Sequence, residues 1–397
     1  MPDHGTPAAG NSAGMRACWA REAEGAWTPR SEPWRQSLWA TGSQLSRQYP
    51  ALAGPDDAAV HLTRANGSCL LNRSPQCWRS AERYRWRPAQ ASRMRADGLH
   101  RAQFCEITAQ RAIQSMLLVG DSITWGMGQS LLGLLGVATG AADLRAGFQK
   151  RARASVPCGR NRSVAVEVTE VTLPGSCGGE GGRGRKEVAT LAAKIVSANV
   201  AVVNFGSHYG AERAARRGQN GTSPFQVFVD DVLCLASELR KAKLALPSLE
   251  ASRNILVWRS TPMGHPGCWS VGKGCRFGSQ GRLRCERYDA PLDDAELEGG
   301  QEGGQEGGHR HWAACTECSG SFNWPMFPGF DRVARDVLGA IGARFLDVST
   351  MSAGRPDGHT AMKHRMGSLP PDCLHYTIPG VPDWWNALLF GAIAECG

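Results

Sequence analysis

Short apolar segments that alternate with helix-like segments are the feature that most constrains the fold of this chain. Five runs have the apolar or β-branched character of strands; they lie at residues 115–120, 164–173, 199–206, 254–262 and 343–350. Four segments have the pattern of helices; they lie at residues 129–137, 225–243, 330–341 and 383–394. Such alternation favours a mostly parallel sheet with helices on both faces. The sequence therefore predicts an α/β fold.

The rest of the chain lies around this alternating region. Residues 1–17 are expected to be disordered, and residues 18–110, rich in Trp, Arg, Pro and Cys, to form a loop-rich part packed on the main domain. That domain is expected to occupy residues 111–397, a length that permits a large core. Flexible insertions are expected within it at 174–187, which is rich in glycine, and at 293–311, which contains EGGQEGGQEGG.

The charge balance is basic, with 45 Lys and Arg against 36 Asp and Glu. A basic surface can attract nucleic acid, anionic lipid or an acidic polysaccharide, and it can also be only a solvated face. The chain has no zinc-finger, RRM or KH pattern, so we expect no nucleic-acid partner.

Fourteen cysteines are scattered through the chain. In a domain of this size they favour disulfides formed in an oxidising compartment. The alternative is a zinc site at Cys315 and Cys318, which form a C-x-x-C just after His309 and His311. Because no second C-x-x-C accompanies them, we expect no metal.

Four N-x-S/T patterns, at Asn66, Asn72, Asn161 and Asn220, also favour the secretory pathway. The N-terminus has no apolar signal core, and no run reaches the roughly 18 apolar residues of a membrane helix. Either the chain is cytosolic with many free thiols, or an N-terminal signal or anchor is missing from it. We favour the second interpretation, with a location in the Golgi or outside the cell.

The first strand-like run ends in an unusual way, in the sequence MLLVGDSITW. Its apolar residues lead directly into Gly120, Asp121 and Ser122. Ligands of open α/β sheets bind at the carboxyl ends of strands, and a helix that starts there directs N–H groups outward. Ser122 could therefore be a nucleophile, or Asp121 and Ser122 could only cap the next helix.

A serine nucleophile needs a base, and His375 is the best candidate. Asp372 lies three residues before it, just ahead of the last helix-like segment. A carboxylate there could hold one ring nitrogen while the other faces the serine. The alternative is that Asp372 caps a turn and His375 is an ordinary buried histidine.

Together these segments resemble a known group of enzymes. Gly120-Asp121-Ser122 with Asp372-x-x-His375 resembles the GDSL/SGNH superfamily, and the ending DCLHYTIPGVPDWWNALLF resembles the DCxHWCLPGxPDxWNxLL of the PC-esterase family. That family includes the trichome birefringence-like polysaccharide O-acetyltransferases. Weaker similarities follow in the family's order, at 25–27, 84–88, 202–210 and 355–362, so the resemblance spans about residues 18–396.

The resemblance implies a three-layer α/β/α SGNH-hydrolase-like fold for residues 111–397. It implies that Ser122 is the nucleophile, His375 the base and Asp372 its orienting acid.

The resemblance also implies binding residues around this triad. The backbone of Ser122 and Gly206 and the side chain of Asn204 would donate to the oxyanion, although Asn204 and Gly206 could only end a strand. His208 and Tyr209 would line the cleft, and His359 would be structural.

Three positions depart from the family pattern. Trp125 and Gly126 stand where the family has Arg and Asn, and Thr377 stands where it has a second cysteine. Cys373 is still expected to form a disulfide, with a partner that the sequence does not identify.

The predicted function is transfer of an acetyl group through an acyl-serine to a hydroxyl of a polysaccharide or glycan. The expected partners are this acceptor and an acetyl donor, with no bound cofactor and with membrane association only through an anchor outside this chain. The alternatives are a carbohydrate acetyl esterase with the same triad, and a non-catalytic glycan-binding protein that uses some of the 13 tryptophans.

Overall fold

The computed structural model describes most of the second half of the chain and parts of the rest. The described residues are 99–137, 150–173, 183–210, 223–247, 253–265, 324–355, 358–359, 373–376, 378 and 380–396, together with the backbone of four short strands. These strands form two antiparallel pairs, β1 (Gly25–Pro29) with β2 (Tyr84–Pro88) and β8 (Gly274–Phe277) with β9 (Leu283–Glu286).

A six-stranded sheet forms the centre of the fold, in the order β10-β7-β6-β3-β5-β4. Its strands are β3 (Ser115–Gly120), β4 (Lys150–Pro157), β5 (Ser163–Glu170), β6 (Val200–Asn204), β7 (Ile255–Arg259) and β10 (Arg344–Leu346). All neighbours pair in parallel except the edge strand β4, which is antiparallel to β5. The predicted mostly parallel sheet is confirmed.

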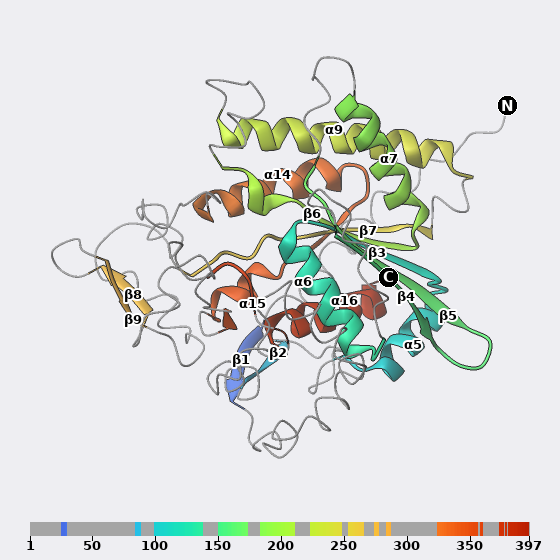
Figure 1. Ribbon diagram of the computed structural model, residues 1–397, viewed down its shortest axis with the longest axis horizontal. Coiled ribbons are helices and arrows are strands. Elements are labelled where there is room, and N and C mark those ends of the chain that lie inside the picture. The colour runs from blue at the N-terminus through green and yellow to red at the C-terminus, as the bar shows by residue number, and fades with distance from the viewer. Residues whose placement is uncertain are drawn as a thin grey trace.

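Helices cover both faces of this sheet (Figure 1). On one side lie α5 (Arg101–Gln110), α6 (Ser122–Leu134) and α16 (Val381–Cys396). On the other lie α7 (Arg183–Ser197), α9 (Pro224–Ala245) and α14 (Phe327–Gly339). Shorter helices are η3 (Gly206–His208), η5 (Trp324–Met326) and α15 (Ser349–Ala353). The three layers agree with the predicted SGNH-like fold.

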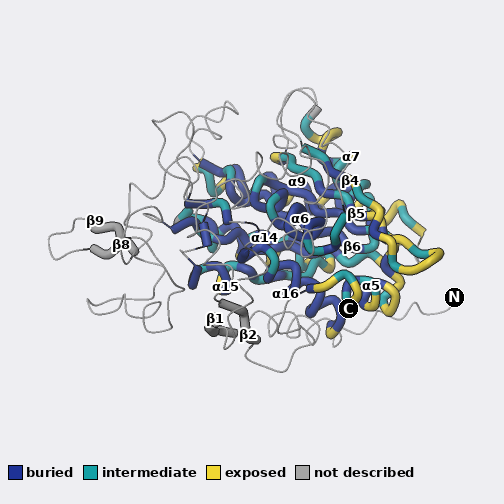
Figure 2. The backbone as a smooth tube through the Cα atoms, turned by 60° about the horizontal axis from the view of Figure 1, so that its bottom comes forward, coloured by how far each residue is buried: buried dark blue, intermediate teal, exposed yellow. Residues whose placement is uncertain are grey.

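The apolar pattern explains this layering. The side chains of β6 are buried along the whole strand, as expected for a central strand covered on both faces. Helix α16 is buried around nearly its whole circumference, because it packs against α6 and α5 and contacts α15 through Trp385. Figure 2 shows the buried backbone concentrated in the sheet and the helices that face it.

Several elements differ from the sequence prediction. Helix α6 begins at Ser122 rather than at 129, and β4, α5 and α7 were not predicted as separate elements. Helix α5 packs Phe104 against Phe390, so the core already begins within the part expected to be loop-rich. The prediction of a flexible insertion at 174–187 is wrong from Arg183 onward, where α7 begins. Apolar side chains spaced along one face hold this helix; they are Val188, Ala192, Ile195 and Val196.

Disulfides are present, as the cysteine content predicted. Cys105 of α5 is bonded to Cys158, which follows β4, and this bond ties the edge of the sheet to the helix layer. Cys234, Cys373 and Cys396 are also disulfide-bonded, which confirms the prediction for Cys373.

Other sequence predictions fall only partly on the described residues. Asn161 lies exposed in the turn between β4 and β5, where a glycan could be accommodated. The other three acceptor asparagines, the C-x-x-C with its histidines, the N-terminal region to residue 98 and the insertion at 293–311 lie outside them, apart from the strands named above. Among the described residues, no helix is both long and apolar enough to cross a membrane.

Gly120, at the end of β3, permits a close contact between two central strands. A Cβ at this position would lie 1.8 Å from the carbonyl oxygen of Asn204 on β6. We expect Gly120→Ala to lower the free energy of unfolding by about 3 kcal/mol, because the strand end must shift to relieve the overlap. Denaturant titration measures this change. Gly339→Ala is the matched control: a Cβ there has open space, and alanine is the better helix former, so its stability should equal or exceed that of the wild type.

Candidate active site

Ser122 is the first residue of α6, directly after the carboxyl end of β3. Asp121 caps this helix: its Oδ1 accepts hydrogen bonds from the N–H groups of Ile123 at 3.1 Å and Thr124 at 3.2 Å. The capping interpretation therefore holds for Asp121. It does not apply to Ser122, whose half-buried hydroxyl has another partner.

The second oxygen of Asp121 connects α6 to the next strand end. Oδ2 accepts from the N–H of Ser207 at 3.1 Å and from its hydroxyl. The guanidinium of Arg259, fully buried at the end of β7, lies 3.8 Å from Oδ1. Neither partner was predicted from the sequence, although a hydroxyl inside the 202–210 block and a charge at the end of a buried run were available signals.

His375 reaches Ser122 from the other end of the chain. Its Nε2 lies 2.7 Å from Oγ of Ser122. The contact depends on how α16 packs against α6. Asp383 in the first turn of α16 accepts a hydrogen bond from Ser130 of α6, and the Asn386 amide donates to a backbone carbonyl of α6 at 3.0 Å. The structure therefore brings the predicted nucleophile and base into contact.

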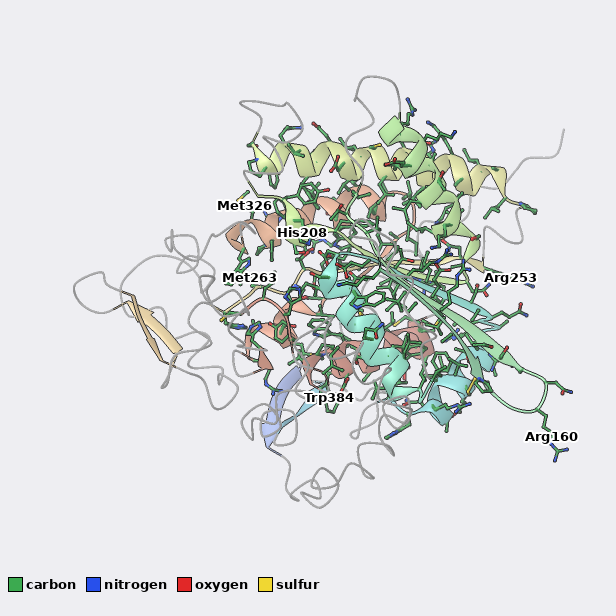
Figure 3. All side chains as sticks on the ribbon, viewed as in Figure 1. Arg160, His208, Arg253, Met263, Met326 and Trp384 are labelled. Atoms are coloured by element: carbon green, nitrogen blue, oxygen red, sulfur yellow. A yellow bond between two sulfur atoms is a disulfide. The ribbon has the colours of Figure 1, made fainter. Side chains whose placement is uncertain are left out.

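The segment that carries His375 is held by its neighbours. The N–H of His265 donates to the carbonyl of Cys373 at 3.0 Å. The hydroxyl of Tyr376 lies 3.1 Å from the carbonyl of Met263 and 3.3 Å from that of Ser352. Figure 3 shows His208 and Met263 at the end of the sheet opposite Arg253, which precedes β7, so these contacts gather at the carboxyl ends of the parallel strands.

Asp372, the predicted third member of the triad, lies outside the described residues. One oxyanion donor predicted from the sequence is available. The backbone N–H of Ser122 has no acceptor among the described residues, and it belongs to the positive end of α6.

The other two predicted oxyanion donors are engaged inside the protein. Both hydrogens of the Asn204 amide are donated, to the carbonyl of Arg259 at 2.7 Å and to Oγ1 of Thr261 at 2.8 Å. The N–H of Gly206 donates to Oδ1 of Asn204 at 3.1 Å. These bonds tie together the ends of β6 and β7, and they count against the predicted oxyanion role.

The two predicted cleft residues behave differently. His208 is half-buried in η3, next to the serine that bonds to Asp121. Tyr209 is completely buried; its hydroxyl donates to Asp231 at 2.7 Å and its ring packs on Phe228 and Phe330. The prediction that Tyr209 lines the cleft is wrong, because its side chain is completely buried against two aromatic rings of the core.

Two of the positions that depart from the family pattern, 125 and 126, lie on α6 close to the serine, whereas Thr377 lies outside the described residues. Trp125 is buried, whereas Gly126 is partly exposed one helical turn after Ser122. Among the described residues, nothing would lie within 4 Å of a Cβ at Gly126, so they leave space beside Ser122 at this point. Gly128 is different, because a Cβ there would lie 2.3 Å from Val168 of β5.

A buried carboxyl, Asp331 of α14, lies behind the strand ends. Its Oδ2 accepts from the N–H of Thr261 at 2.7 Å and its Oδ1 from Trp258 Nε1 at 3.1 Å. Burial raises the pKa of Asp331 to about 7, against the lowering effect of these hydrogen bonds and of the Arg259 charge. Burial likewise lowers the pKa of Arg259, against the charges of Asp121 and Asp331.

A three-layer fold with a serine after the central strand and a histidine just before the last helix is consistent with the GDSL/SGNH-like fold that the sequence predicted. Residues 310–392 match the PC-esterase family, described as a GDSL/SGNH-like acyl-esterase family found in Pmr5 and Cas1p. The match covers this segment alone, and it agrees with the resemblance found in the sequence. It contains His375 and Asp372, whereas Ser122 lies outside it.

Curated plant proteins are similar over short segments. Xylan O-acetyltransferase 2 of Oryza sativa subsp. japonica is 31% identical over 129 residues, which are 30% of this chain and 22% of that relative. Trichome birefringence-like 42 of Arabidopsis thaliana is 36% identical over 75 residues, 17% of this chain and 21% of that relative. Xylan O-acetyltransferase 7 of rice is 37% identical over 76 residues, 15% and 13% of the respective chains. The chain therefore matches about a fifth or less of the length of each of these relatives.

The raised pKa of Asp331 predicts a pH dependence of stability. The folded protein keeps this proton up to about pH 7, whereas the unfolded chain releases it near the ordinary value of 3.8. The folded state binds more protons in this interval, so its stability decreases as the pH rises. In the wild type we expect the free energy of unfolding to decrease by up to about 4 kcal/mol between pH 4 and 7, and we expect Asp331→Asn to lack this decrease. Denaturant unfolding of both proteins across this range measures it; parallel curves would contradict the assignment.

Proposed function

We propose that this protein is an O-acetyltransferase that carries an acetyl group on Ser122 and transfers it to a hydroxyl of a polysaccharide. The observation that carries the proposal is the 2.7 Å contact between Ser122 Oγ and His375 Nε2 at the carboxyl end of the central strand. The names of the relatives, two of them xylan O-acetyltransferases, support a polysaccharide acceptor.

The first half of the reaction loads the serine. Ser122 Oγ attacks the carbonyl carbon of an acetyl donor while Nε2 of His375 takes the hydroxyl proton. The negative charge that develops on the carbonyl oxygen is stabilised by the N–H of Ser122 at the start of α6. When the intermediate collapses, His375 gives its proton to the leaving group. Acetyl-serine remains.

The second half transfers the acetyl group. A sugar hydroxyl gives its proton to His375 and attacks the acetyl-serine, and the proton returns to Ser122 as the ester bond to the serine breaks. Asp372 holds the tautomer of His375 and stabilises the imidazolium that forms in each half. If water takes the place of the sugar, the same steps give an esterase.

Features around the serine support this use of the site. A Cβ at Gly126 would meet no described atom within 4 Å, which supports access for an acceptor beside the nucleophile. The acetyl donor is a second substrate, and the mechanism uses no bound cofactor. The Cys105–Cys158 disulfide supports a location in the secretory pathway, which for a polysaccharide acetyltransferase would be the Golgi.

Labelling with a fluorophosphonate tests whether Ser122 is an activated nucleophile. We expect the wild type to be labelled, and Ser122→Ala to lose labelling together with about four or more orders of magnitude in turnover of a simple acetyl ester. Ser155→Ala, a change at an exposed serine of β4, is the matched control and should be labelled normally. Absence of labelling in the folded wild type would instead favour a glycan-binding protein without catalytic activity.

A transfer assay separates the acetyltransferase from the esterase. The protein is incubated with an activated acetyl ester and xylo-oligosaccharides, and the products are analysed by mass spectrometry. We expect acetylated sugar that is absent with Ser122→Ala. Free acetate as the sole product, at saturating sugar, would assign the esterase function.

A further inference from the structure

Two buried histidines lie directly behind the segment that carries His375. Nδ1 of His265 lies 2.6 Å from Nε2 of His359, so the two rings share a hydrogen bond. Nε2 of His265 lies 2.8 Å from the carbonyl oxygen of Ala353, at the end of α15. Nδ1 of His359 lies 3.2 Å from the carbonyl oxygen of His375. The pair therefore connects α15 to the backbone of the proposed catalytic base.

Counting the ring protons shows what charge this arrangement requires. A carbonyl oxygen can only accept, so His265 Nε2 and His359 Nδ1 must each carry a proton. The bond between the rings needs one more. Three protons on four ring nitrogens give the pair a single positive charge. Two neutral rings would leave one of the three bonds unmade, and two imidazolium rings would set two N–H groups against each other.

Because both rings are buried, the loss of any of these three hydrogen bonds would be costly in free energy. His265 and His359 are 3% and 4% exposed, so water cannot readily replace a lost partner. The ring of Tyr376 lies 4.2 Å from that of His359, centroid to centroid, and its π face can stabilise a cation. His375, in the same segment as Tyr376, and Arg355, which follows α15 and lies near Gly358, are further titratable or charged residues close to the pair.

We propose that His359 and His265 hold one extra proton between them, and that His359 uses it to position His375. With this charge, His359 donates at Nδ1 to the His375 carbonyl while it remains anchored through His265 to α15. The antiparallel bridge between His359 and Tyr376 fixes the same segment by its backbone. The effect on catalysis rests on the proposed function. The number of protons on the pair follows from the hydrogen bonds alone and does not depend on that function.

A consequence for the pH profile follows. Loss of the extra proton as the pH rises leaves two protons for three bonds, so the His375 carbonyl can lose its donor. The contact between Nε2 of His375 and Ser122 then loosens, and activity falls at high pH. His375 itself must lose its proton to act as a base, so activity should also increase as the pH is raised from low values. The loss of activity at high pH is separate from this increase.

Nuclear magnetic resonance of histidine-labelled protein tests the charge directly. Long-range proton–nitrogen spectra distinguish neutral from doubly protonated rings, and His265→Gln and His359→Asn assign the signals. We expect one ring of the pair to be protonated on both nitrogens at neutral pH. Two neutral rings would overturn the proposal, even in an active enzyme.

Kinetics of two conservative variants test the positioning. Asparagine at 359 keeps an N–H near the Nδ1 position, facing the His375 carbonyl, whereas glutamine keeps one only near Nε2. We expect His359→Gln to lower kcat by about tenfold to a hundredfold with little change in KM, because the base is displaced. His359→Asn should stay within about threefold of the wild type and lack the fall at high pH. His100→Asn, a change at an exposed histidine before α5, is the control and should match the wild type.

The outcomes separate this proposal from the proposed function. If the wild type neither reacts with the fluorophosphonate nor turns over an acetyl ester, the proposed function fails, and the resonance spectra still decide whether the pair is charged. If the wild type is active, and both variants at 359 keep its kcat and its pH profile, the positioning role is overturned. Melting temperatures close to that of the wild type show that the variants are folded.

Discussion

The site depends on the hydrogen bonds that the carboxylate of Asp121 accepts. One oxygen caps α6 by accepting two N–H bonds, and the other accepts the N–H and the hydroxyl of Ser207 after β6. A buried carboxylate with this many donors fixes the ends of two strands and the start of a helix relative to one another. Arg259 provides the compensating charge from a third strand. Ser122 is placed by this cluster, although its own side chain takes no part in it.

The base is placed by a different set of contacts. His375 precedes α16, which is buried against α6, and it belongs to a segment that is hydrogen-bonded to residues 263–265 and to His359. The nucleophile thus lies where β3 joins α6, whereas the base lies in the segment just before the last helix, α16. The two meet only when both halves of the core are packed. This explains how residues 253 positions apart form one contact.

Local sequence patterns were sufficient to predict some parts of the fold and the site, and they were not sufficient for the rest. The apolar run into Gly120, Asp121 and Ser122 predicted a strand end, and the tail around His375 predicted the base, because both patterns are continuous in sequence. Strand β4 was missed because few of its side chains are buried at the sheet edge. The roles of Arg259, Asn204 and His265 depend on partners more than 50 positions away, which no local pattern reveals. Tyr209 was misplaced because an aromatic residue after a strand looks the same whether it faces a cleft or the core.

The central claim is that the Ser122 hydroxyl and the His375 imidazole act as one catalytic unit. A kinetic double-mutant cycle with Ser122→Ala, His375→Ala and the double variant, on an acetyl ester, tests it most directly. Members of a unit are strongly non-additive, so the double variant should be about as slow as either single variant. If the two losses instead multiply, the residues act independently, and the contact seen at 2.7 Å is not the catalytic one.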